Sequence, residues 1–139
     1  CQLVASCDLA YAAAGARFAV SGIDLGLFCS TPSVALSRAV KRKTALEMLL
    51  TGRFLDAAEA QAGGLINRAV APEDLDRVVD ESAAAIAEKP PEAVALGKAL
   101  FGRQIEMSLE DAYGLAARRM AENLAFSSAR SGIDRFLKR

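Results

Sequence analysis

The sequence contains no histidine. This absence excludes Ser-His-Asp hydrolysis and Cys-His proteolysis, and it removes the commonest metal ligand. Cysteine is also scarce, and the three cysteines are Cys1, Cys7 and Cys29. Because their number is odd and no two are closely spaced, neither a disulfide framework nor a zinc site is expected. We therefore expect no metal and a reducing, intracellular location. Any acid–base chemistry then falls to carboxylates, lysines and tyrosines.

Excess charge of either sign is missing too. The 17 basic residues balance the 17 acidic residues, so the chain has no overall field that would attract nucleic acid or an anionic membrane. Its longest apolar runs, such as TALEMLLTG, are much shorter than the roughly 20 residues that a membrane span requires. With 139 residues, 53% of them hydrophobic, the chain has enough material for one soluble, packed domain.

The sequence starts at Cys1, with no initiator methionine and no pattern of a signal peptide. We therefore expect it to be the later part of a longer polypeptide. The expected location is the cytoplasm, or the mitochondrial matrix if the source is a eukaryote.

The first third of the chain is predicted to contain strands. Residues 2–7 have the composition of a helix, and the short apolar runs on either side of Gly15 suit strands. The stretch FAVSGIDLGLF, residues 18–28, reads as an extended, half-buried segment that stops at glycines. Thr31 and Pro32 have the pattern of an N-cap and a first helical turn, which predicts a helix of two or three turns.

The remainder is predicted to be mostly helical. Helices are indicated by apolar residues at helical spacing, by glycine stops at Gly52 and at Gly63 with Gly64, and by proline starts. Ser108 is the predicted N-cap of one helix, with Asp111 at its third position. The predicted elements are helices ending at residue 52 and at residues 63–64, a strand over 65–70, helices over 72–89, 91–105 and 108–126, and a loop with a short amphipathic helix near the end.

We divide the chain into a core portion, residues 1–71, and a helical portion, residues 72–139. The three alanine-rich helices of the second portion have more apolar surface than one small core covers easily. Two interpretations are open: these faces meet another subunit, or they pack on a portion of the protein outside this sequence.

Several motifs taken together carry a family resemblance. They are CDLAYA at residues 7–12, LEMLLTGRFLDAAEAQAGGLINRAV at residues 46–70, and the terminal SGIDRFLK. Each motif alone is weak, but in this order they resemble the crotonase superfamily, also called the enoyl-CoA hydratase/isomerase family, over essentially the whole length.

The resemblance implies an α/β fold, classed as α+β in some schemes. It is a spiral of ββα units, here its C-terminal portion, with a helical trimerisation region. It also implies an acyl-CoA substrate whose thioester oxygen binds in an oxyanion hole of two backbone N–H groups, which stabilise an enolate where its charge develops. Both donors lie before Cys1 in relatives. Coenzyme A enters as part of the substrate, and no separate cofactor is expected.

The family's two catalytic glutamates correspond by resemblance to Gln2 and Gly22. Neither residue can transfer a proton, although the Gln2 amide can still hold a water molecule. Addition of water to a double bond needs a base and an acid, each typically contributing about 10²–10⁴-fold. The resemblance therefore implies that hydration is weak or absent while thioester binding persists.

Asp24 lies two residues beyond Gly22 and, in an extended segment, would point to the same side. It is our candidate for a single base that moves a proton between carbons in an isomerase-like reaction. The alternative is that Asp24 accepts hydrogen bonds from backbone N–H groups in a turn between glycines.

Other candidate residues follow from the resemblance. Leu25 and Phe28 are candidate substrate-binding residues, and Phe136 and Arg139 fall where relatives contact the coenzyme A moiety. The alternative is that these terminal residues form an ordinary solvated tail. Cys29 is either a nucleophile activated by a helix N-terminus or a plain, partly buried thiol. The basic run at residues 41–43 is interpreted as a solvated helix junction.

The leading hypothesis is an acyl-CoA enzyme of the lyase or isomerase type, acting in fatty acid metabolism as a homotrimer or hexamer, and not as an efficient two-glutamate hydratase. The alternative is a non-catalytic acyl-CoA-binding or scaffold subunit.

Overall fold

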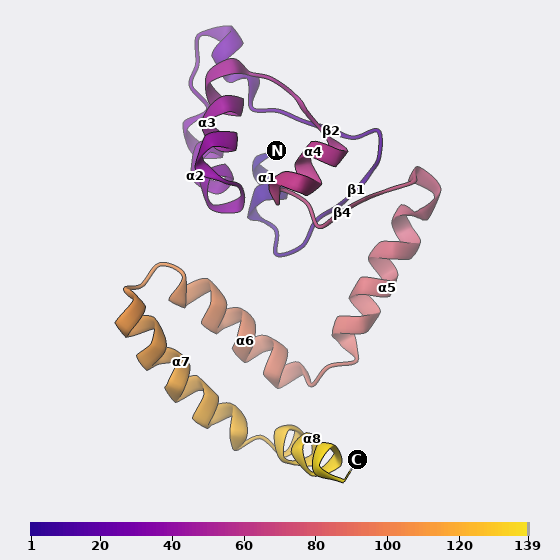
Figure 1. Cartoon of the computed structure of the whole chain (residues 1–139), viewed down its shortest axis with the longest axis vertical. Helices are drawn as coiled ribbons and strands as arrows, with labels where there is room; N and C mark the ends of the chain where they lie inside the picture. Colours follow the sequence, from indigo (N-terminus) through magenta and orange to yellow (C-terminus); the bar gives the residue numbers. More distant parts are fainter. Residues whose placement is uncertain (139) are drawn as a thin grey trace. The chain divides into compact units, whose positions relative to one another are not determined.

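A computed structural model describes residues 1–138. The chain forms two compact units, Cys1–Asp80 and Glu81–Arg139 (Figure 1). The first unit contains α1 (Gln2–Ser6), β1 (Tyr11–Ala13), β2 (Arg17–Phe18), the 3₁₀ helix η1 (Ser21–Leu25), α2 (Ser30–Ala39), α3 (Arg42–Thr51), β3 (Leu55–Asp56), α4 (Ala57–Gly63), β4 (Arg68–Val70) and the 3₁₀ helix η2 (Pro72–Asp74). The helix α5 (Leu75–Ala87) crosses from the first unit into the second, which continues with α6 (Pro91–Gln104), α7 (Leu109–Leu124) and α8 (Ser127–Leu137).

The strands form two short pairs in the first unit. β1 and β4 are parallel, with Tyr11 opposite Arg68, and β2 and β3 are antiparallel, with Phe18 opposite Leu55. Asn67 extends the parallel pair, because its Oδ1 accepts the Ala10 N–H at 2.8 Å and its own N–H donates to the Ala10 carbonyl at 2.7 Å. These contacts tie segments that are far apart in sequence.

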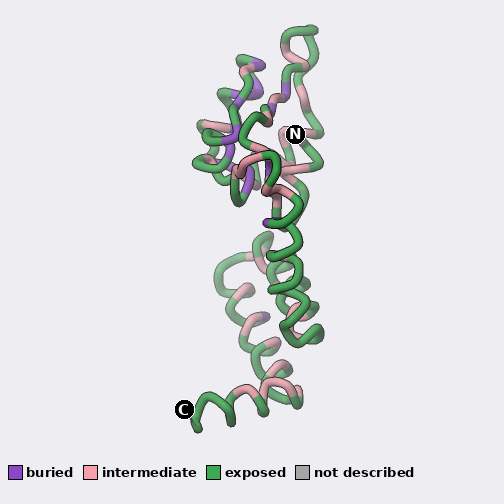
Figure 2. Tube along the Cα trace, turned by 90° about the vertical axis from the view of Figure 1, so that its right-hand side faces the viewer, coloured by how far each residue is buried: buried purple, intermediate pink, exposed green. Residues whose placement is uncertain are grey.

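The hydrophobic core belongs almost entirely to the first unit, where the buried segments gather in Figure 2. Leu36 of α2, Met48 of α3 and Leu55 of β3 are the largest fully buried side chains. Removing such side chains from water is the main favourable contribution to folding. The core therefore fixes α2 and α3 against the strand layer, and with them the turn that precedes α2.

Several sequence predictions about helix ends are confirmed. Gly52 ends α3 in the left-handed conformation with φ +66°, and Gly64 ends α4 with φ +85°. Glycine adopts these angles without the steric cost that a Cβ atom imposes. Ser108 caps α7, since its Oγ accepts the Asp111 N–H at 3.2 Å.

Other predictions are wrong. Residues 18–28 are not one extended segment, because β2 ends at Phe18 and residues 21–25 form η1. The cause is Gly26, whose φ of +76° turns the chain back so that the Leu27 N–H reaches the Gly22 carbonyl at 2.9 Å. Thr31 is not the N-cap of α2, which begins at Ser30 after Cys29. The predicted strand over 65–70 is confirmed only for its last three residues.

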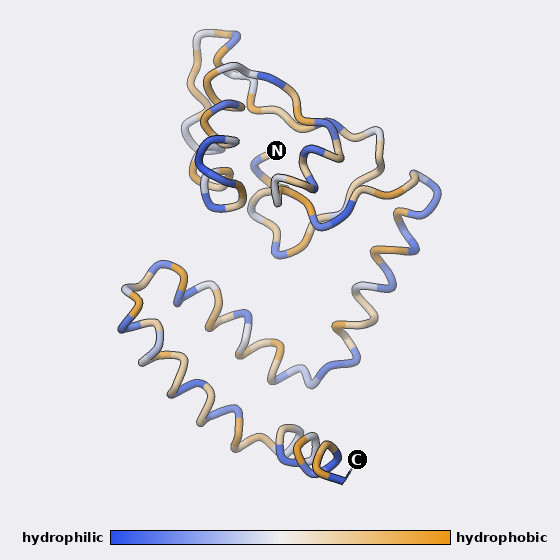
Figure 3. The backbone as a smooth tube through the Cα atoms, viewed as in Figure 1, coloured by the Kyte–Doolittle hydropathy of each residue, from blue (hydrophilic) through white to orange (hydrophobic). Residues whose placement is uncertain are grey.

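In the second unit, α6 and α7 lie side by side and run in opposite directions (Figure 1). Apolar and polar residues alternate along both helices in Figure 3. Leu115 is the one buried residue of α7, whereas Leu109, Tyr113, Met120 and Leu124 of the same helix are exposed. The two helices therefore leave much apolar surface uncovered within this unit.

Candidate functional site

The turn from Ser21 to Cys29 holds most of the predicted site residues. It begins with η1 and closes through two backbone hydrogen bonds, from the Gly26 N–H to the Ile23 carbonyl at 3.0 Å and from the Leu27 N–H to the Gly22 carbonyl at 2.9 Å. The turn leads directly into α2. These two hydrogen bonds fix the backbone of the turn, and the fixed backbone sets the direction in which each side chain of the turn leaves it.

Gly22 sits in a space with no room for a side chain. Its N–H donates to Cys29 Sγ at 3.3 Å. A Cβ atom at position 22 would lie 2.7 Å from that sulfur and 2.8 Å from the Leu27 carbonyl oxygen. The thiol of Cys29 is thus a hydrogen-bond acceptor within the turn, and the residue is half-buried.

Asp24 does not lie on the same side as Gly22, because a 3₁₀ helix has about three residues per turn and residues two apart point in different directions. The carboxylate of Asp24 instead lies against Gly52 at the end of α3, where a Cβ atom would be 2.7 Å from Oδ2. Within residues 1–138 this carboxylate accepts no hydrogen bond from the turn, so the alternative role of binding backbone N–H groups there is not seen. Asp24 itself is exposed.

The remaining candidates of the first unit lie near the surface. Gln2 is the first residue of α1 and is exposed, with its carbonyl accepting the Ser6 hydroxyl at 3.0 Å. Leu25 is 81% exposed and is available for contact with another molecule. No described contact joins the side chains of Gln2 and Asp24, so the structure leaves their roles as predictions.

Phe28 lines an open hollow of about 480 Å³ between α2 and α3. Its lining combines apolar side chains with the hydroxyls of Ser33 and Ser37 and the guanidinium of Arg42. Both hydroxyls already donate to α2 carbonyls. Arg42 belongs to the basic run whose three residues are all exposed at the start of α3. The sequence alone did not indicate that Arg42 and Phe28 share a hollow, because they lie on different elements.

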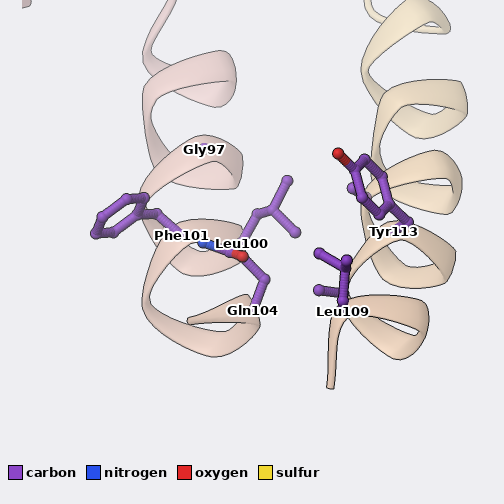
Figure 4. Close-up of a pocket in the computed structure, with 8 residues that line it drawn as sticks. Gly97, Leu100, Phe101, Gln104, Leu109 and Tyr113 are labelled. Carbon is purple, nitrogen blue, oxygen red and sulfur yellow. The ribbon is translucent and has the colours of Figure 1, made fainter. Parts of the chain in front are cut away.

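Phe136 is 74% exposed on α8, and Arg139 lies outside the described residues. Another hollow, of about 430 Å³, lies between α6 and α7 in the second unit. In Figure 4, Leu100, Leu109 and Tyr113 extend into the space between the two helices, whereas Phe101 extends to the other side of α6. This hollow is largely apolar and was not predicted.

One cluster of charged residues joins α3, β3 and α4. Arg53 pairs with Glu59 at 3.0 Å and with Glu47 at 3.3 Å. The pKa of Glu59 is lowered, first by the hydrogen bond from the Asp56 backbone N–H and then by Arg53, while the pKa of Arg53 is raised chiefly by its hydrogen bond to Glu59. Together with the capping box between Asp56 and Glu59, this cluster fixes the start of α4.

Residues 1–138 contain neither a metal-binding cluster nor a membrane-spanning helix. No group of three or more cysteine, aspartate or glutamate side chains is placed to hold a metal ion. Across the same residues, every helix is too short or too polar to cross a bilayer.

Comparison with known protein families decides the affiliation. The family model described as enoyl-CoA hydratase/isomerase matches residues 1–139. The chain belongs to the enoyl-CoA hydratase/isomerase family. The expected crotonase-like fold is confirmed by solved structures of this family.

The alignments with three relatives cover 99–100% of the chain. It is 48% identical over 139 residues to the enoyl-CoA hydratase domain-containing protein 3, mitochondrial, of Xenopus laevis, and 46% identical to the human protein of the same name. A probable enoyl-CoA hydratase of Rhizobium meliloti is 33% identical over 141 residues. The chain spans 47%, 46% and 54% of these three relatives, respectively, and thus about half of their length.

Solved structures of the family superpose closely. An enoyl-CoA hydratase of Mycobacterium smegmatis is 56% identical and matches 99% of this chain with a TM-score of 0.96. Human enoyl Coenzyme A hydratase domain-containing protein 3 is 46% identical and matches 99% of this chain with a TM-score of 0.93. The chain covers 53% and 54% of those structures.

Proposed function

We propose that the protein binds acyl-CoA thioesters and lacks efficient hydratase activity. The observation that carries this proposal is the environment of Gly22, where a family glutamate is expected. No side chain fits there, because Cys29 Sγ and the Leu27 carbonyl occupy the space. With Gln2 at the other expected glutamate position, neither site offers a group that transfers a proton.

Family membership supports thioester binding as the retained property. The names of the relatives refer to enoyl-CoA hydratases, and the chain matches the family model from end to end. We propose Leu25 and Phe28 as substrate contacts in the first unit, and Phe136 with Arg139 as contacts to the coenzyme A moiety. The exposure of Leu25 and Phe136 is compatible with such contacts. Coenzyme A is then part of the substrate.

Asp24 is the proposed base of a reaction that moves a proton without adding water. The support is that its carboxylate is exposed and accepts no hydrogen bond within the described residues. The second candidate function, a non-catalytic acyl-CoA-binding subunit, is favoured by the contact of the same carboxylate with Gly52, which gives Asp24 a packing role.

Asp24→Asn in the full-length protein separates the two functions. Butyryl-CoA affinity is measured by calorimetry, and conversion of 3-enoyl-CoA to 2-enoyl-CoA is followed by absorbance. If Asp24 is the base, we expect at least a roughly 100-fold loss of isomerisation with little change in affinity. If the protein is a binding subunit, neither form isomerises the substrate and both bind it. Absence of any acyl-CoA binding by the parent protein would refute the proposal.

We further propose a homotrimer, or a hexamer of two trimers, as the assembly. The uncovered apolar face of α7 supports a role for that helix in subunit contact. The proposed location is the cytoplasm, or the mitochondrial matrix in a eukaryote, since the vertebrate relatives carry the word mitochondrial in their names.

A further inference from the structure

Gly22 and Cys29 occupy each other's space. The Gly22 N–H donates to Cys29 Sγ at 3.3 Å, and the same sulfur would be 2.7 Å from a Cβ atom at position 22. That separation is far below the ordinary contact distance between such atoms. The Leu27 carbonyl oxygen, 2.8 Å from the same Cβ position, closes a second side.

Position 22 needs glycine for space and not for conformation. The glycines with a left-handed backbone are Gly26, Gly52 and Gly64, and Gly22 is not among them. An L-residue could adopt the Gly22 backbone angles if the sulfur and the carbonyl moved away. Moving either atom costs free energy, since the sulfur is on a short side chain and the carbonyl oxygen belongs to the backbone.

Leu27 and Cys29 are both held in place by other contacts. The Leu27 N–H is bound to the Gly22 carbonyl, and Cys29 precedes α2 and packs against the core of the first unit. A displacement of the sulfur therefore disturbs either the turn or the start of α2.

We infer that Cys29 is a positioning residue that, together with the Leu27 carbonyl, closes position 22 to every side chain, so that this turn excludes a carboxylate there. The inference rests on the proposed function and deepens it. On this view the missing proton carrier cannot be restored by substitution at position 22 alone.

A thermodynamic cycle in the full-length protein tests the pair. Gly22→Ala is expected to lower Tm by about 3–10 °C, because the methyl group overpacks the turn. Gly15→Ala is the matched control, since a Cβ atom at Gly15 meets nothing within 4 Å, and we expect its Tm within about 2 °C of the parent. In Gly22→Ala/Cys29→Ala the sulfur is gone, so the double variant is expected to lose less than the two single variants together.

A catalytic arm tests the exclusion of a carboxylate. The Gln2→Glu variant and the Gln2→Glu/Gly22→Glu variant are compared in crotonyl-CoA hydration. We expect the second variant to hydrate no faster than the first and to melt at lower temperature. Gln2→Glu alone controls for any effect of the first substitution on folding.

The inference is overturned if Gly22→Ala melts like Gly15→Ala, if the losses in the cycle simply add, or if Gln2→Glu/Gly22→Glu gains at least about tenfold in hydration with unchanged Tm. Failure of the proposed function gives a different result from failure of this inference. In that case the parent protein itself would hydrate crotonyl-CoA efficiently or fail to bind acyl-CoA.

Discussion

At the scale of single residues, a contact between distant segments decides what Asp24 and Gly52 do. Asp24 and Gly52 are far apart in sequence, and the contact of the carboxylate with the Gly52 backbone exists only because η1 packs on the end of α3. No periodicity or spacing reports such a contact. The sequence therefore indicated Asp24 as a candidate, but the predicted direction of its side chain, toward the same side as Gly22, was wrong.

Gly52→Ala tests the contact with Asp24. Both Gly52 and Gly26 have positive φ, but a Cβ atom at Gly26 meets nothing within 4 Å, whereas at Gly52 it would meet the Asp24 carboxylate at 2.7 Å. We expect Gly26→Ala to lower the free energy of unfolding by about 1–2 kcal/mol, the cost of a left-handed alanine. Gly52→Ala should cost about 1–3 kcal/mol more, from overpacking. Equal losses in urea denaturation would contradict the contact.

At the scale of elements, the sequence predicted the long helices well and the short strands poorly. Gly52, Gly64 and Ser108 are local signals whose effect on the chain needs few distant partners, and each acts as predicted. β3 has two residues and forms only by pairing with β2. Residues 18–28 were predicted to be one extended segment, but a left-handed glycine and a backbone hydrogen bond make η1 instead.

The start of α4 depends on Asp56, whose side chain accepts the Glu59 N–H at 2.8 Å. Asp56→Ala removes this cap and is expected to lower the free energy of unfolding by about 0.5–2 kcal/mol. Asp56→Asn retains an acceptor oxygen and is the matched control, expected to lose much less. The two variants are compared by urea denaturation. A loss in the asparagine variant as large as in the alanine variant would show that the hydrogen bond is not the source.

The charge of Glu59 makes stability depend on pH. The pKa of Glu59 is lowered by the hydrogen bond from the Asp56 N–H and by Arg53. Because the folded pKa is the lower one, this stabilisation is complete above the ordinary value of 4.5 and is lost as pH falls through the folded pKa. Glu59→Gln keeps the capping geometry without the charge. We expect it to be less stable than the parent near neutral pH, with the difference vanishing in acid; a difference independent of pH would contradict this assignment.

At the scale of the whole molecule, the two units differ in how well they bury their apolar side chains. Among residues 1–138, fourteen of the fifteen buried hydrophobic residues lie in the first unit, and Leu115 is the fifteenth. The sequence anticipated this excess of apolar helical surface in the second unit but left two explanations open. Either another subunit covers it, or a portion of the protein outside this sequence does.

Met120→Glu distinguishes these explanations. Met120 is 61% exposed on α7, and a charge there has little effect on a solvated face but is costly in an apolar contact. If α7 meets another subunit, we expect the full-length variant to shift to a smaller mass in analytical ultracentrifugation. If α7 packs within one subunit, the mass is unchanged and Tm falls. Glu110→Lys, on an exposed residue of the same helix, is the control; no change in either quantity for Met120→Glu would contradict both explanations.

We propose that this member of the family binds thioesters but lacks the proton carriers for adding water. The most direct test measures crotonyl-CoA hydration by the full-length protein beside a family hydratase that has both glutamates, with butyryl-CoA affinity determined on the same preparation. We predict measurable affinity and a hydration rate lower by about 10⁴-fold or more, from the loss of an acid and a base. A hydration rate equal to that of the two-glutamate enzyme would contradict the claim.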